Sequence, residues 1–272
     1  GFTLIELSLV LVIIGLIIGG VLVGKDMIKA SEVRAQISQL EKFSTAVHTF
    51  RLKYGQMPGD MDGVNAASLG FVARAGTAGR GDNNGAIISN NYAAPIAPWY
   101  ALYPWGQSAE ALFFWEDLSQ SELIEGRFNT AADAAFGFTS NRFERYFPAA
   151  KIGNGNFVSV FSGGIYSGGV LSDPHKNFFT VSIPVSITGS GNYTSSAGMS
   201  AQQAYNIDLK IDDGLPRAGT VKAFFNQGGG APVAWSTNAA TDDATTCFNT
   251  TSNTYSISNG DALNCGLSLR LQ

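Results

Sequence analysis

The sequence predicts an α+β fold in which a long N-terminal α-helix packs on an antiparallel β-sheet. The first 54 residues contain no proline and carry apolar residues at helical spacing. Two later segments, FVSVF (157–161) and FFTVSIPVSI (178–187), alternate and are rich in β-branched and aromatic residues, which is typical of strands. We therefore divide the chain into a continuous helix over 1–54 and a globular head over 55–272.

The first part of the predicted helix is apolar enough to cross a membrane. Residues 2–24 include one charged side chain, that of Glu6. At 1.5 Å per residue the stretch reaches about 34 Å, and a bilayer core is about 30 Å thick. Lys25 and Lys29 follow without a break in the helical pattern, which argues against a cleaved secretory signal. The glycines between Gly15 and Gly24 favour either close helix packing or local loosening of the helix.

The second part of the helix, residues 25–54, is amphipathic. Its apolar stripe should pack on the head, while most charged residues lie off it. Gly55 follows and should end the helix. The predicted stripe consists of Val33, Ile37, Leu40, Phe43, Val47, Phe50 and Tyr54.

In the head, residues 108–120 have the spacing of a short amphipathic helix. A capping-box pattern, Ser200 to Gln203, predicts a second helix that ends at Asp213 and Gly214. Residues 220–225 should form another strand, and Pro184 favours an edge position for the strand that contains it. The tail from Gly228 is polar and should form loops.

The cysteines, Cys247 and Cys265, lie close together in that tail. Two histidines and no CxxC spacing argue against a zinc site. In an exported chain the pair favours one disulfide, and two buried free thiols are the alternative.

Glu6 is the unusual residue of the apolar segment, because an unpaired carboxylate inside a membrane costs several kcal/mol. Lying near the start of the segment, it could reach the lipid headgroups. Alternatively, it pairs with the α-amine of a neighbouring chain, which would set the axial stagger between subunits.

The opening GFTLIEL resembles the prepilin motif shared by type IV pilins and type II secretion pseudopilins. The resemblance implies a pilin-like fold, a prepilin peptidase that cuts after Gly1, methylation of the new N-terminal Phe2, and a role for Glu6 in assembly. It also implies an inner-membrane precursor that joins an assembly machinery and forms a homo-oligomeric helical filament, with residues 2–24 as its core. If Gly1 were retained, the α-amine would lie one residue further from Glu6 than the family pairing requires.

Several functions stay open within this resemblance. The first is the structural subunit of an extracellular, pilus-like filament with a role such as adhesion; the others are a periplasmic pseudopilin and a minor or tip pilin. The head segments YGQMPGD (54–60), FFWEDLSQSELIEG (113–126) and IDLKIDDGLPRAG (207–219) are similar to segments of large prepilin-like proteins. They indicate no specific activity.

Calcium is the one cofactor that the sequence raises. Asp82 and Asn84 place oxygen ligands at alternate positions of a glycine-rich loop, and Asp208, Asp212 and Asp213 form an acidic cluster next to Gly214. Calcium in the head is also common among secretion pseudopilins, which the chain resembles. Plain turns are the favoured alternative at both places.

Neither an enzyme nor a nucleic-acid-binding protein is expected. Charged residues make up 14% of the chain, the net charge is −4, and there is no basic run. The chain has no GxSxG, no P-loop and no GxGxxG after a strand. A membrane-anchored hydrolase with the helix as a tether is the distant alternative.

Overall fold

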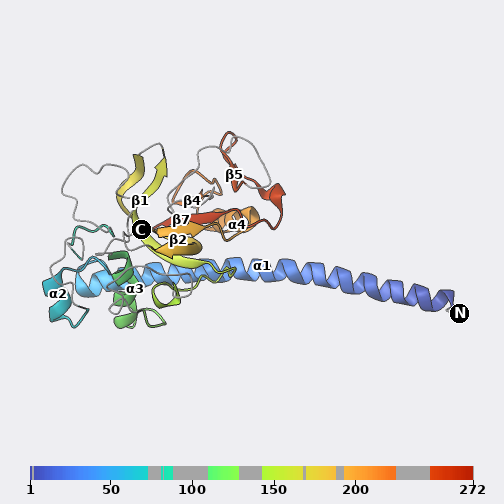
Figure 1. Ribbon diagram of the computed structural model, residues 1–272, viewed down its shortest axis with the longest axis horizontal. Helices are drawn as coiled ribbons and strands as arrows, with labels where there is room; N and C mark the ends of the chain where they lie inside the picture. Colours follow the sequence, from blue (N-terminus) through green and yellow to red (C-terminus); the bar gives the residue numbers. More distant parts are fainter. Residues whose placement is uncertain are drawn as a thin grey trace.

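The computed structural model describes residues 1, 3–72, 81, 83–87, 110–128, 143–167, 170–187, 193–224 and 246–271. These residues form an α+β arrangement, as predicted. In Figure 1 the N-terminal half of the long helix α1 projects alone, and its C-terminal half lies along the head. The elements are α1 (Leu4–Tyr54), α2 (Gly63–Ser68), α3 (Glu110–Gln120), η2 (Phe143–Arg145), β1 (Phe157–Ser167), β2 (Val170–Ile187), β3 (Tyr193–Ser196), α4 (Ala201–Ile211), β4 (Val221–Phe224), β5 (Phe248–Asn249), β6 (Thr254–Tyr255), η3 (Ile257–Asn259) and β7 (Gly266–Arg270).

Helix α1 ends at the predicted residue, Tyr54, and begins at Leu4, three residues after the predicted start. Thr3 is its N-cap, and Gly55 closes it in a left-handed conformation (φ 73°) that glycine adopts without steric cost. The N–H of Gly55 donates to the carbonyl of Arg51 at 2.8 Å. The helix is continuous from Gly15 to Gly24 in the single chain. Local loosening of the helix outside lipid and close packing of these glycines against other helices both stay predictions.

The predicted stripe on the second half of α1 is the face that packs on the head. Val33, Leu40, Phe43, Val47 and Phe50 are buried there, while Ile37 and Tyr54 are half-buried at the margin of the core. The hydrophobic contact along this face joins helix and head into one structural unit.

Two glutamines on α1 add polar contacts that the apolar pattern does not reveal. Gln36 is buried, and its Oε1 accepts a hydrogen bond from the N–H of Ile152 at 3.0 Å. One turn along, Gln39 donates to the carbonyl of Ala149 at 2.8 Å and accepts from the N–H of Lys151 at 3.0 Å. Together they bind the turn that leads into β1.

The main sheet is antiparallel, with strand order β1-β2-β7-β4 and β3 paired to β2. Strand β2 has neighbours on both sides around Phe179, so the predicted edge position does not hold for the strand as a whole. It holds locally, because Pro184 lies beyond the pairing with both β1 and β7 and faces only β3. Proline has no N–H to donate, so this is where the ladder tolerates it.

The prediction of loops throughout the C-terminal tail is wrong for 266–270. These residues form β7, which lies between β2 and β4 inside the sheet. Leu267 and Leu269 alternate with Ser268 and Arg270, and this short alternation is the strand pattern hidden in a polar tail.

The core is centred on Trp115, where α1, α3 and β2 meet. Its ring lies 4.9 Å from that of Phe43 on α1 and 5.9 Å from that of Phe179 on β2, measured between centroids. The observed span of α3 is close to the predicted 108–120. The predicted capping box of α4 is also present, since Ser200 and Gln203 exchange side chain–backbone hydrogen bonds of 3.0 and 3.2 Å.

Candidate functional site

The apolar half of α1 lies outside the head. An 18-residue window of this helix has a mean hydropathy of 2.9, and none of it is buried. Leucine, isoleucine and valine side chains between Leu4 and Ile28 are largely exposed all around the helix. A helix that is apolar on every side is stable only inside lipid or among other helices. The structure therefore agrees with the predicted membrane-spanning segment in length and in composition.

Glu6 takes part in a capping box at the start of this segment. Its Oε2 accepts hydrogen bonds from the backbone N–H and the hydroxyl of Thr3, both at 2.8 Å, and its own N–H donates to the Thr3 hydroxyl at 3.4 Å. Oε1 accepts no hydrogen bond from the described residues. Thr3 was not singled out in the sequence, although the T-x-x-E spacing is the signal for this cap. Gly1 is exposed, and Phe2 lies outside the described residues.

Two lysines join α1 to the C-terminal part of the head just beyond the apolar segment. The carboxylate of Asp261 accepts hydrogen bonds from Lys25, at 2.7 Å, and from Lys29. We call this three-residue contact the lysine clasp. The hydrogen bond from Lys25, followed by the one from Lys29, lowers the pKa of Asp261 to about 2. The carboxylate of Asp261 is consequently ionised throughout the physiological pH range.

The predicted disulfide is present. Cys247 and Cys265 are bonded and buried, so the alternative of two free thiols is excluded. Cys265 exchanges backbone hydrogen bonds with Met199, and β7 starts at the next residue. The disulfide thereby attaches the segment that carries Asp261 to the central sheet.

The predicted acidic cluster forms at the end of α4. Carboxylate oxygens of Asp208, Asp212 and Asp213 lie within 4.8 Å of one another. The helix ends at Ile211, two residues before the predicted end, and Gly214 is left-handed (φ 74°). A tight turn at a helix C-terminus, the favoured alternative, describes this geometry.

Most oxygens in this cluster already accept hydrogen bonds. Asp208 accepts from the hydroxyl of Tyr255 at 2.6 Å and from the N–H of Gly214 at 3.2 Å. Asp212 accepts from two backbone N–H groups at the start of β4, and Asp213 accepts from Leu215 at 2.8 Å. Calcium takes six to eight oxygen ligands. The carboxylates would have to release these donors to bind it, so calcium at this cluster stays a prediction.

Asp208 should make stability depend on pH. Burial raises its pKa from 3.8 to about 6, against the opposing effect of the Tyr255 hydrogen bond. Between these values the folded chain binds more protons than the unfolded one, so the free energy of unfolding falls as pH rises from about 4 to 6. Asp208→Asn should remove this part of the slope, as measured by urea unfolding at pH 4, 5, 6 and 7. Asp213→Asn, at an exposed position of the same cluster, is the control; an unchanged slope in Asp208→Asn would contradict the assignment.

The other calcium candidates lie in the loop around residues 81–85. Asp82 is outside the described residues. The Oδ1 of Asn84 accepts from the N–H of Ala86 at 2.7 Å, which is the hydrogen bond of a plain turn. Calcium at this loop also stays a prediction.

Three buried carboxylates that the sequence did not single out hold this loop region together. Asp60 accepts from the N–H groups of Asn83 and Gly85, each at 2.7 Å. Glu110 accepts from Gly81 at 3.0 Å, and Asp117 accepts from Gly59 at 2.7 Å. Two of the recognised head segments, 54–60 and 113–126, therefore meet here. Gly59 allows this close backbone approach, since a Cβ at its position would lie 2.4 Å from the carbonyl oxygen of Glu110.

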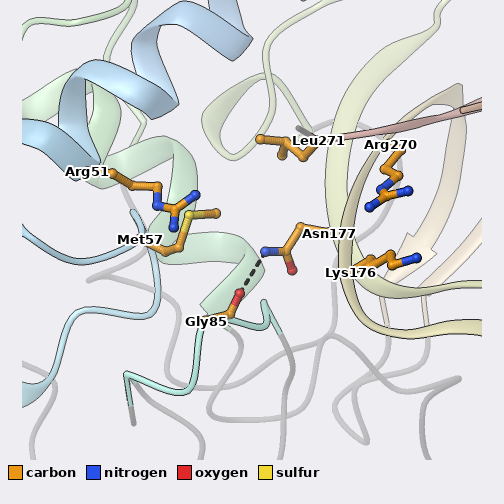
Figure 2. A pocket seen from close by; sticks show the side chains of 7 residues that line it. All are labelled: Arg51, Met57, Gly85, Lys176, Asn177, Arg270 and Leu271. Atoms are coloured by element: carbon orange, nitrogen blue, oxygen red, sulfur yellow. Dashed lines mark hydrogen bonds between the residues drawn. The ribbon is translucent and has the colours of Figure 1, made fainter.

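Figure 2 shows a cavity of about 230 Å³ where the C-terminal end of α1 meets β2 and β7. Asn177 shapes it by donating to the carbonyl of Gly85 and accepting from the N–H of Ile87, both at 2.8 Å. Arg51 and Arg270 have no carboxylate partner within the described part of the chain, so the cavity favours anions over metal ions. Its lining residues are Arg51, Met57, Gly85, Lys176, Asn177, Arg270 and Leu271.

Comparison with known proteins adds no relative. No family model matches the chain, no curated protein is significantly similar to it, and no solved structure matches its fold.

Proposed function

We propose that this protein is the structural subunit of a pilus-like extracellular filament and that it polymerises through the apolar half of α1. One observation carries the proposal: α1 is a single helix that is apolar and exposed before Lys25, and from Val33 onward one face of it is buried against the head. Lipid can cover the exposed half in the membrane. Outside lipid, apolar surface of this extent has to be covered by other copies of the same helix.

The proposal assigns a role to Glu6. In the filament, an oxygen of Glu6 pairs with the α-amine of a neighbouring subunit, whose mature first residue is Phe2 after peptidase cleavage behind Gly1. A buried ion pair is satisfied in one register only, so the pair defines how far one subunit rises above the next. The capping box supports this role, because it occupies Oε2 and leaves Oε1 accessible.

The proposal also covers the pilin-like fold, the inner-membrane precursor and the homo-oligomeric filament. A periplasmic pseudopilin or a minor pilin remains the second reading, since the N-terminal motif is common to all of them. The long helix packed on an antiparallel sheet supports each of these readings equally.

Electron microscopy of material sheared from the cell surface tests the proposal. We expect filaments that contain this chain as their main component, with an intact mass that lacks Gly1 and carries one methyl group on Phe2. Loss of protein export on deletion of the gene, without surface filaments, would instead identify a pseudopilin. Both proposed functions would be contradicted if the chain stays monomeric in the membrane and deletion of its gene changes neither the surface filaments nor protein export.

A further inference from the structure

The lysine clasp fixes one part of the head at the level where α1 leaves the apolar segment. Lys25 directly follows Gly24, the last residue of that segment, and Asp261 is bonded to Lys25 and to Lys29 one turn later. In Figure 1 the red C-terminal part of the head reaches furthest along α1 toward the N-terminus. We call residues 256–263 the proximal loop.

The proximal loop exposes two apolar side chains close to the clasp. Ile257 is 49% exposed and Leu263 is 43% exposed, only four and two residues from Asp261. In a membrane-inserted chain, Lys25 lies at the edge of the hydrocarbon core. Headgroups extend about 5–8 Å beyond that edge, so the loop lies at their level.

Hydrogen bonds attach the proximal loop to the rest of the head. Asn259 donates to the carbonyl of Thr246 at 2.9 Å, and the N–H of Ser256 donates to the carbonyl of Cys247 at 2.9 Å. The disulfide closes the same segment. Because these contacts join the loop to the head, Ile257 and Leu263 stay exposed in the single chain.

The charges near the loop indicate which kind of contact it makes. Lys25 and Lys29 are balanced by Asp26 and Asp261, so the described residues of this region carry no excess of positive charge to attract anionic lipids. Apolar side chains gain free energy at the boundary between headgroups and acyl chains regardless of lipid charge. The expected partner is therefore the surface of a bilayer of any headgroup charge.

We propose that the proximal loop docks on the bilayer surface and inserts Ile257 and Leu263 among the lipid headgroups before the subunit is assembled. This contact holds the head at a defined depth and inclination relative to the membrane. The inference rests on the membrane insertion of α1, which is part of the proposed function.

Quenching by brominated lipids tests the inference with the full-length chain. The protein is reconstituted into phosphatidylcholine vesicles with bromine placed on the acyl chains near the glycerol backbone. In each of Ile257→Trp and Leu263→Trp, the added tryptophan contributes fluorescence above the wild-type signal. The brominated lipid should quench at least a third of this added fluorescence. Val64→Trp, at an 81% exposed position on α2 at the opposite end of the head, should lose less than a tenth.

Leu11→Trp, inside the apolar segment, separates failure of the inference from failure of the membrane anchor. If Leu11→Trp is quenched but Ile257→Trp and Leu263→Trp are quenched as little as Val64→Trp, the docking proposal is overturned and the membrane anchor stays intact. Absence of quenching in Leu11→Trp would overturn membrane insertion as well. Adding Asp261→Asn to Ile257→Trp should reduce the quenching at least twofold, because the clasp no longer holds the loop at this level; unchanged quenching would contradict the role of the clasp.

Discussion

Replacing Glu6 with glutamine is expected to stop filament growth while the subunit stays in the membrane. Glutamine keeps an oxygen that can accept from the N–H and hydroxyl of Thr3, so the capping box survives. The negative charge is lost, and in the proposed filament the α-amine of the neighbouring subunit would be left unpaired in an apolar surrounding. Breaking a buried pair in this way costs about 3 kcal/mol or more, which corresponds to about a hundredfold weaker association per contact.

The structure makes this experiment sharper, because the cap and the charge can be changed separately. Thr3→Ala removes the hydroxyl and keeps the carboxylate of Glu6, whereas Glu6→Ala removes both the charge and its part of the cap. If pairing between subunits matters, Glu6→Gln and Glu6→Ala both abolish filaments and Thr3→Ala retains them. Filaments are counted by electron microscopy, and membrane fractionation checks insertion. Normal filaments in Glu6→Gln, with loss in Thr3→Ala, would show that Glu6 acts as a helix cap and not as an ion-pair partner.

Removing the disulfide should lower the free energy of unfolding more than any other substitution proposed for this chain. The Cys247→Ser, Cys265→Ser double variant opens a loop with a sequence separation of 18 residues, and the chain-entropy model gives a loss of about 3 kcal/mol. Both positions are buried, so each serine also places a hydroxyl in the core. Urea unfolding of the full chain in detergent, followed by circular dichroism, measures the change.

Reduction of the wild-type protein is the matched control for that experiment. It opens the same loop without introducing serines, so the difference between the reduced wild type and the double variant measures the cost of the hydroxyls. Ser258→Ala, at an exposed position within the loop, should leave the unfolding midpoint unchanged. An unchanged midpoint after complete reduction would show that the disulfide does not stabilise the head.

The long helix, its C-terminal end and the cap of α4 were predictable because their signals are local. Apolar spacing identified the buried stripe, and Gly55 and the Ser200 box marked helix ends that the structure has. The disulfide followed from the number of cysteines. The acidic cluster was found because Asp208, Asp212 and Asp213 lie close together in the sequence, next to Gly214.

The remaining features depend on contacts between distant parts of the chain. Nothing in the sequence distinguishes three buried carboxylates, Asp60, Glu110 and Asp117, from ordinary surface carboxylates. Only the fold shows that each accepts a hydrogen bond from a backbone N–H of a distant loop. Strand β7 is short, and its place inside the sheet depends on two partner strands that no local pattern specifies. The lysine clasp joins residues more than 230 positions apart, so its partner could not be inferred from either segment alone.

The contacts of Gln36 and Gln39 have a mechanical consequence. Apolar packing alone lets a helix roll about its own axis, because such contacts have little directionality. Hydrogen bonds from two successive turns to the backbone of Ala149, Lys151 and Ile152 are directional, and they prevent this rolling. Torque applied to the exposed N-terminal half of α1 is therefore transmitted to the head. In the proposed filament, the rotation of each α1 helix about its own axis would determine which side of its head faces outward.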